Sequence, residues 1–379
     1  MPLSDVLHQE VAVDRLQRTL QSKRVPHAYL FTGPSGVGRE LLATRLAKLL
    51  LCTGRSTQDS GGLFAASAPK SEDFADACGQ CEDCILFAAG NHPDFHRIHR
   101  TLNKLHPDKN IQRRKAIDLG IDVIRHFLLD RIALSPSRGH AKIFLIVDAD
   151  RLNLQSQNAL LKTLEEPPGH SYLILLANAA DELLPTTRSR CQQIPFGPLP
   201  DDFIRERLAA QGVTGDAAAF ITQLAQGSLG SALRYADMKL YERAGEVLAA
   251  IEQSADDPLA AGKALVDLAK ELASDSDRDD AEEADTSATR EAQGLVIAMA
   301  STILRDIARV AAGASPVALP NAAAIGKLAG CTSRPAIGEA VRRMGLAEYQ
   351  IDMNANASLT FDAIGIALGE GLTAAVATR

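Results

Sequence analysis

A glycine-rich turn between an apolar run and a helical repeat limits most strongly how this chain can fold. The turn, residues 33–40, reads GPSGVGRE. It follows the apolar run Ala28–Phe31 and precedes Glu40–Leu51, where leucines recur at helical spacing. A glycine turn between a strand and a helix is typical of a phosphate-binding loop, whose pattern is G-x-x-x-x-G-K followed by serine or threonine.

The residues that would act on a nucleotide are replaced in this loop. Gly33, Gly36 and Gly38 preserve a backbone that can point N–H groups at phosphate. However, Arg39 and Glu40 replace the lysine that contacts the β- and γ-phosphates and the hydroxyl that binds magnesium. The loop is either a working nucleotide site or an inherited turn that no longer binds productively. The substitutions favour the second interpretation.

Further apolar segments extend the alternation of strands and helices. Residues 143–147, IFLIV, are typical of a strand buried on both faces, and Asn158–Glu166 reads as a helix that ends before Pro167. We therefore predict an α/β fold, a parallel five-stranded sheet with helices on both faces. Pro195 places the last strand near an edge, because proline cannot donate to a ladder. The predicted strands are Ala28–Phe31, Phe95–Ile98, Ile143–Val147, Tyr172–Leu176 and Gln193–Phe196.

The acids after IFLIV bear on the same nucleotide site. Asp148 ends the strand and could face a magnesium ion. Ala149 stands where an active ATPase of this kind has a glutamate that activates water, and Asp150 points elsewhere if the strand continues. Fast hydrolysis by this chain is therefore not expected, because positioning and electrostatic stabilisation both suffer. The candidate residues of this degenerate site are Gly33, Gly36, Gly38, Arg39 and Asp148.

Local composition divides the chain and excludes some classes of protein. After Pro198 strand-like runs disappear and helical patterns dominate, which suggests units at 1–198, 199–240 and 241–379. No apolar stretch reaches the ~18 residues of a membrane span, and the first residues show no secretory signal. Ser274–Thr286 holds seven acids and one arginine, so we predict a solvated, disordered loop there. Arg97–Lys115 holds seven bases, which could contact nucleic-acid phosphates or belong to a solvated loop, the favoured interpretation.

Four cysteines have the spacing of a metal site. Cys78, Cys81 and Cys84 form C-x₂-C-x₂-C, and Cys52 follows the first helix. Four thiolates suit a closed structural zinc site at about residues 52–84, with an insert at 53–77, and such a site stabilises or docks rather than catalyses. An iron–sulfur cluster or three reduced surface thiols are the alternatives. A histidine could also replace Cys52, the candidates being His92, His96 and His99. Cys331 has no partner pattern and is expected in the core.

The segment 187–191 reads TRSRC and offers an arginine for a neighbouring protein. Arg188 is expected to be a solvated charge. Four features occur in one order, namely GPSGVGRE, the cysteine set, NALLKTLEEPP at 158–168 and SRC at 189–191. Together they resemble the bacterial clamp-loader subunits of DNA polymerase III, in the AAA+ ATPase superfamily. The degraded loop and VDAD at 147–150 resemble the delta-prime branch, and so does Gly230, where gamma/tau motors carry an arginine.

The resemblance is strong over 1–240 and implies an architecture and a role. It implies an AAA+ α/β domain, a small helical lid and an all-α collar over the three units. The chain would join delta and gamma/tau subunits in a five-subunit ring that loads the sliding clamp onto primed DNA in the bacterial cytoplasm. It would thus belong to a DNA-directed DNA polymerase holoenzyme, a nucleotidyltransferase, without activity of its own. Arg190 would reach the ATP site of the adjacent gamma/tau subunit, with its loop held by Ser189 and Cys191.

Two functions of other classes compete with this interpretation. One is an active ATPase motor of gamma/tau type, against which Arg39, Glu40 and Ala149 argue. The other is a zinc-dependent DNA-binding module that acts alone. Outside the acidic block the chain carries a net charge of only about −1, which argues against tight autonomous binding of DNA.

Overall fold

The chain divides into two compact units, Met1–Leu199 and Pro200–Arg379, and within the second the helices after residue 240 pack with those before it. The structure is a computed structural model. It describes residues 6–21, 25–55, 77–114, 116–138, 141–276, 284–314, 322–332, 334–353 and 355–373. Most of the insert at 53–77 therefore lies outside the described residues, as does Lys115.

The first unit is built on the predicted parallel five-stranded sheet, in the order β2-β3-β4-β1-β5. Each predicted strand is confirmed to within one residue at each end. The edge position predicted from Pro195 is also correct, since β5 ends the sheet. The strands are β1 (Ala28–Thr32), β2 (Phe95–Ile98), β3 (Lys142–Ile146), β4 (Ser171–Ala177) and β5 (Gln192–Pro195).

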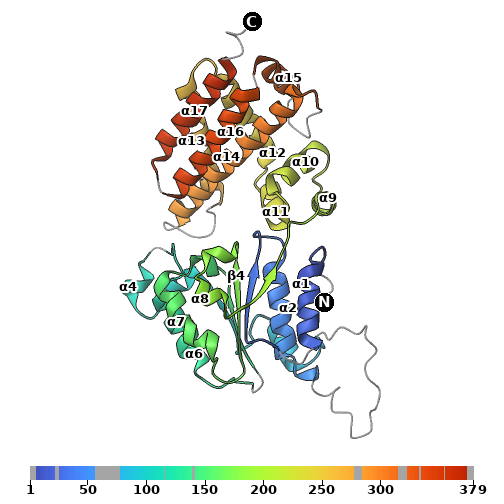
Figure 1. The fold of residues 1–379 in the computed structure, drawn as a ribbon, viewed down its shortest axis with the longest axis vertical. Helices are drawn as coiled ribbons and strands as arrows, with labels where there is room; N and C mark the ends of the chain where they lie inside the picture. The colour runs from blue at the N-terminus through green and yellow to red at the C-terminus, as the bar shows by residue number, and fades with distance from the viewer. Residues whose placement is uncertain are drawn as a thin grey trace. The chain divides into compact units, whose positions relative to one another are not determined.

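Helices cover both faces of this sheet (Figure 1). Helix α2 (Arg39–Leu51) contacts β1, β3 and β4, and α7 (Leu154–Glu165) packs Leu160 and Leu164 into a core cluster with strand residues. Helix α7 begins four residues before the predicted start. The reason is Asn153, whose Oδ1 accepts a hydrogen bond from Ser156 N at 2.9 Å and so caps the helix.

The remaining helices of the first unit precede or connect these elements. The α-helices are α1 (Glu10–Gln21), α3 (Glu82–Ala88), α4 (Lys109–Gln112), α5 (Ile121–Ile124), α6 (Asp130–Ile132) and α8 (Pro185–Arg188). Tighter or wider turns of helix are η2 (Thr53–Arg55), η3 (Arg100–Leu105), η4 (Arg125–Leu129), η5 (Ala149–Arg151) and η6 (Ala180–Glu182). The described part of the basic stretch, residues 97–114, thus contains the end of β2, η3 and α4 rather than one continuous loop.

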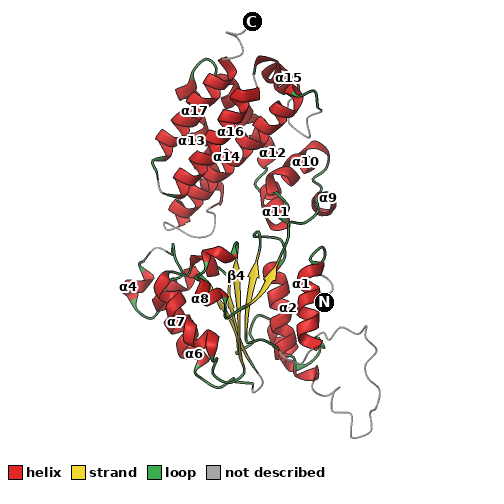
Figure 2. Cartoon of the chain, viewed as in Figure 1, coloured by secondary structure: helices red, strands yellow, loops and turns green. Residues whose placement is uncertain are grey.

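The second unit is helical throughout its described residues, as predicted (Figure 2). Helix α13 packs on α14 and α17, and α16 packs on the same two helices. Gly365 permits the α13–α17 contact, because a Cβ there would lie 2.0 Å from the carbonyl oxygen of Pro258. The helices are α9 (Asp201–Ala210), α10 (Gly215–Ala225), α11 (Leu229–Asp237), α12 (Leu240–Gln253), α13 (Pro258–Ser276), α14 (Ala284–Ala311), α15 (Ala322–Cys331), α16 (Arg334–Asp352) and α17 (Ala357–Thr373).

Two expectations for this unit are wrong. The acidic block 274–286 is not wholly a loop, because α13 continues to Ser276 and α14 begins at Ala284; residues 277–283 lie outside the described part. Cys331 is exposed rather than in the core, since it ends α15. Among the described residues, no helix has the length and apolar character to cross a membrane.

Candidate functional site

The phosphate loop keeps the backbone of a phosphate-binding turn. Gly33, Gly36 and Gly38 have φ angles of 141°, 73° and 104°, values that favour glycine. A Cβ on Gly33 would lie 2.4 Å from the carbonyl oxygen of Phe196, just after β5. The Gly33 N–H donates to the carbonyl of Asn178 at 3.1 Å, so the loop is fastened to the end of β4. Gly33 therefore serves the packing of the loop against its own sheet.

Arg39 is bound by the chain itself. Its guanidinium donates to the carbonyl oxygen of Ala177 and, at 2.9 Å, to Asn178 Oδ1. Asn178 in turn donates through Nδ2 to Asp150 Oδ2 at 3.2 Å. Burial lowers the pKa of Arg39, while Asp150 and three further acids act in the opposite direction. The side chain that replaces the phosphate-binding lysine thus joins helix α2 to the ends of β3 and β4.

Glu40 and Asp148 are also paired with positive charges of the same chain. Arg97 Nε lies 2.7 Å from Glu40 Oε1, and Arg100 Nε lies 4.0 Å from Asp148 Oδ2. Arg97 belongs to β2, and Arg100 follows two residues after it, at the start of η3. Both acids at the loop edge therefore already have a cationic partner within the chain.

Sequence reasoning missed the partners at this edge. Arg97 and Arg100 were grouped with a basic stretch that could contact nucleic acid, and Asn178 was not considered. Their positions at or just after the carboxyl ends of parallel strands are the signal that could have found them, because such ends meet at one edge of a sheet. Of the other bases in that stretch, Arg114 is paired with Asp122 at 2.8 Å.

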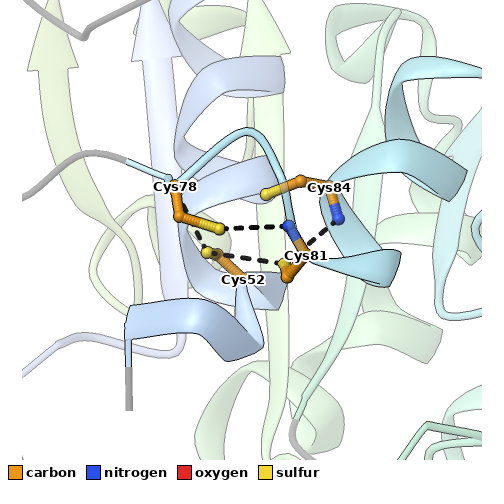
Figure 3. Close-up of side chains that lie close together, drawn as sticks. All are labelled: Cys52, Cys78, Cys81 and Cys84. Atoms are coloured by element: carbon orange, nitrogen blue, oxygen red, sulfur yellow. Dashed lines mark hydrogen bonds between the residues drawn. The ribbon is translucent and has the colours of Figure 1, made fainter. Parts of the chain in front are cut away.

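The four predicted cysteines lie together at the end of α2 and the start of α3 (Figure 3). The Sγ atoms of Cys52, Cys78, Cys81 and Cys84 are all within 4.8 Å of one another. The Sγ atoms of Cys52 and Cys81 are 3.9 Å apart, well beyond the ~2.05 Å of a disulfide. A tetrahedral zinc ion with Zn–S bonds of about 2.3 Å separates its sulfurs by about 3.8 Å. The cluster therefore fits one tetrahedral metal ion.

Backbone N–H groups point at three of the four sulfurs and favour their thiolate forms, while burial raises the pKa of Cys52. Cys78 N lies 3.2 Å from Cys52 Sγ, Cys81 N lies 3.3 Å from Cys78 Sγ, and Cys84 N lies 3.4 Å from Cys81 Sγ. Burial acts to raise the pKa of Cys81, but hydrogen bonds, first among them that of Thr53, lower it to about 5. Burial raises the pKa of Cys84. Metal binding requires deprotonated ligands, so these donors prepare the site.

In the described part of the chain, no histidine joins the four cysteines. His92 Nε2 lies 3.5 Å from Asp83 Oδ1, His96 stacks on Phe144 with ring centroids 4.9 Å apart, and His99 Nδ1 lies 2.7 Å from Thr101 Oγ1. The separation of the sulfurs suits a single ion better than an iron–sulfur cluster, which places several irons and sulfides between its thiolates.

A buried acidic network, which the sequence did not suggest, attaches the cysteine module to the sheet. Asp83 is buried; it accepts from Thr53 Oγ1 at 2.6 Å and is paired with Arg138. The backbone N–H of Arg138 donates at 2.8 Å to Asp94, a second buried acid just before β2. Because Asp83 is buried, losing the Arg138 side chain would remove the arginine that neutralises its charge.

Arg190 lies just after α8, where its side chain meets the end of α7. Its Nε donates to Glu165 Oε1 at 2.7 Å, and its Nη1 donates to the carbonyl of Thr186 at 2.8 Å. The side chain keeps 32% of its surface exposed. Ser189 Oγ lies 3.5 Å from Nη1, and Cys191 is half-buried. The two segments NALLKTLEEPP and SRC therefore meet through the pair of Glu165 and Arg190.

Comparison with known proteins places this geometry in a family. The family model described as DNA polymerase III, delta subunit, matches residues 8–200, just over half of the chain. The chain belongs to this family. It is 33% identical over 207 residues to the DNA polymerase III subunit delta′ of Pseudomonas aeruginosa, covering 55% of this chain and 54% of that protein. It is 31% identical over 250 residues to subunit tau of Salmonella typhimurium, covering 64% of this chain and 34% of that protein.

These relatives confirm the predicted family of DNA polymerase III subunits, and the fold is the predicted α/β fold, a parallel five-stranded sheet with helices, followed by a helical C-terminal part. A DNA polymerase III gamma subunit-related protein from Thermotoga maritima is a structural neighbour with a TM-score of 0.46 and 17% identity, covering 94% of this chain and 98% of that one. The chain spans about half the length of the delta-prime relatives it matches.

Proposed function

We propose that this chain is the delta-prime, non-motor subunit of a bacterial DNA polymerase III clamp loader. The observation on which this rests is the phosphate-loop edge, where Arg39, Glu40 and Asp148 are each held by partners of the same chain. Delta-prime relatives match at 29–33% identity and tau relatives at 31%, so the choice of branch rests on this edge. The chain would then act in the cytoplasm as part of a polymerase holoenzyme, without turnover of its own.

In this role the chain contributes one arginine to a neighbouring subunit. Arg190 would reach the ATP site of the adjacent gamma/tau subunit in a five-subunit ring with delta. An arginine supplied in trans stabilises the charge that develops on the transferred phosphoryl group and is worth about 10³–10⁵ in kcat. The ring would use the hydrolysis to load the sliding clamp onto primed DNA.

The test is ATP hydrolysis by the reconstituted loader with clamp and primed DNA, beside this chain alone. We expect no turnover by the chain alone. In the complex, Arg190→Ala should remove one site's contribution, so that one ATP fewer is hydrolysed per complex in the first turnover. Arg188→Ala is the matched control, because Arg188 has no side-chain partner among the described residues. A first turnover unchanged by Arg190→Ala would contradict the assignment.

The tau relatives keep the motor alternative open to test, since they match a longer part of this chain than the delta-prime relatives do. A motor would bind ATP tightly without partners. Equilibrium dialysis of the isolated chain against labelled ATP with magnesium separates the two functions. Saturable binding with turnover would establish the motor and overturn the proposal.

We also propose that the cysteine cluster holds a structural Zn²⁺. The ligands would be the four thiolates, which leave no open position for a substrate. When bound, the ion would supply charge neutralisation for the thiolates and join α2 to α3. The chain's own part is to direct backbone N–H groups at the sulfurs and to fix the module through Asp83 and Arg138.

A further inference from the structure

The pair of Glu165 and Arg190 carries an inference that rests on the proposed function. We propose that Glu165 is a positioning residue. It holds the Arg190 guanidinium in the orientation needed to contact the phosphates of a nucleotide bound to the neighbouring subunit. The two residues come from different segments of the chain, the end of α7 and the turn after α8, and are joined by hydrogen bonds to Nε and Nη2.

The place of Glu165 in its helix is unfavourable unless it has a cation beside it. Glu165 is the last residue of α7, where the negative end of the helix dipole repels a carboxylate. Arg190 supplies the compensating charge. Glu166, the next residue, is exposed like Glu165, but it has no side-chain hydrogen bond or ion pair among the described residues. Of these two adjacent glutamates, Glu165 is the one that contacts Arg190.

The hydrogen bonds that Arg190 makes leave part of the guanidinium available. Its planar group has five N–H donors. Glu165 accepts along the Nε–Nη2 edge, and the carbonyl of Thr186 accepts from Nη1. Ser189 Oγ, at 3.5 Å, lies at the limit of a hydrogen bond. One donor on Nη1 and one on Nη2 remain, and these can bind phosphate oxygens.

The backbone that presents Arg190 is fixed without Glu165. At the start of α8, Gln157 Oε1 of α7 accepts from Leu184 N at 2.8 Å and lies 3.4 Å from Thr187 Oγ1. Both Gln157 and Thr187 are buried. The turn after α8 is also closed locally, since Arg190 N donates to the carbonyl of Thr187 at 3.2 Å. Removing the Glu165 carboxylate therefore frees a side chain and leaves the fold of the segment intact.

Preorganisation explains why such a contact would matter for a neighbour's chemistry. A free arginine side chain samples many rotamers, and fixing one of them at the moment of reaction slows the step. A displacement of about 1 Å in a group that stabilises a transition state can cost on the order of 10² in rate. The carboxylate also withdraws part of the positive charge, but the geometry that it imposes outweighs this loss for a group that must be aimed.

The experiment uses the full chain in the reconstituted loader with clamp and primed DNA. The variants are Glu165→Ala, Glu165→Gln, Glu166→Gln as the matched control, and Arg190→Ala alone and combined with Glu165→Ala. The readouts are the single-turnover rate constant of the site that Arg190 serves, the ATP concentration at half-saturation, and ring assembly by gel filtration. Circular dichroism of each variant reports whether the chain is folded.

We expect Glu165→Ala to slow that site by roughly tenfold to a hundredfold, with half-saturation by ATP and assembly unchanged. Glu165→Gln should be intermediate, because an amide oxygen still accepts one hydrogen bond. In the Arg190→Ala background, Glu165→Ala should have no further effect, since it acts through the arginine. Glu166→Gln should behave as the wild type.

Other results would overturn the inference in distinguishable ways. A Glu165→Ala rate equal to the wild type, beside a slow Arg190→Ala, would refute the positioning role and leave the proposed function standing. A faster Glu165→Ala would show that the carboxylate restrains the arginine instead. An additional loss in the double variant would mean that Glu165 acts elsewhere. An Arg190→Ala complex with normal turnover would remove the proposed function and this inference together.

Discussion

The phosphate-loop edge and the cysteine module differ in how their polar groups are satisfied. At the edge, Arg39 and Glu40 replace the side chains that would bind phosphate and magnesium, and both are paired with other residues of the chain. In the module all four sulfurs converge within 4.8 Å, although thiols are weak hydrogen-bond partners for one another. A motif therefore indicates a bound ligand where the polar side chains of the motif have no other partners in the fold. Where those side chains are paired within the chain, the motif indicates only that the backbone of the site has been inherited.

The largest effect in this comparison is expected from the metal. Cys81→Ser, or treatment with a chelator, should lower the metal content from about one ion per chain to near zero, because three thiolates hold zinc less well than four. At a free zinc concentration a thousand times Kd, binding contributes about 4 kcal/mol to the free energy of unfolding, which would be lost. Elemental analysis and urea unfolding followed by circular dichroism measure both quantities.

Cys331→Ser is the matched control for that measurement. Cys331 is an exposed cysteine on α15, outside the cluster, so metal content and stability should stay at the wild-type values. A Cys81→Ser chain that retained a full equivalent of metal would contradict a four-thiolate site. An absorption band of sulfide-bridged iron in the purified protein would replace zinc by the iron–sulfur alternative.

The sequence was sufficient for the sheet and for the cysteine ligands because both depend on local patterns. Runs such as IFLIV can be buried on both faces only as central strands, and C-x₂-C-x₂-C brings three sulfurs to one turn by itself. The start of α7 was missed because Asn153 as a cap was overlooked, not because the signal was absent. The helical ends of the acidic block were missed because charge was taken to exclude helix.

The partners of the site residues could not be read from local patterns. The pairing of Glu40 with Arg97 joins residues 57 positions apart, and that of Glu165 with Arg190 joins residues 25 apart. Such contacts follow from which strand and helix ends meet in the folded sheet. The motif residues themselves were identified, whereas the chemistry of their surroundings required the structure.

A smaller loss of stability is expected from substituting the loop glycines. Measuring it without nucleotide tests their role in backbone packing separately from any role in nucleotide binding. Gly33→Ala should destabilise the chain by about 2–4 kcal/mol, because a Cβ would add a clash with the Phe196 carbonyl to the cost of a positive φ. Gly38→Ala should cost only about 1 kcal/mol, since its φ is also positive but the nearest atom would be Val6 Cγ1 at 3.6 Å. Urea unfolding without nucleotide measures both, and equal losses would refute the close approach.

The smallest effect on the free energy of unfolding is expected from the exposed ion pair of Arg97 and Glu40 at the phosphate-loop edge. Arg97 and Glu40 are 47% and 45% exposed, so solvent screens their attraction. Arg97→Ala should change the free energy of unfolding by less than about 1 kcal/mol, and the coupling in a double-mutant cycle with Glu40→Ala should shrink further in 1 M salt. The pair would then satisfy the charge of Glu40 without stabilising the fold much. A coupling above about 2 kcal/mol would instead mean that the edge, like the cysteine module, is a structural support of the domain.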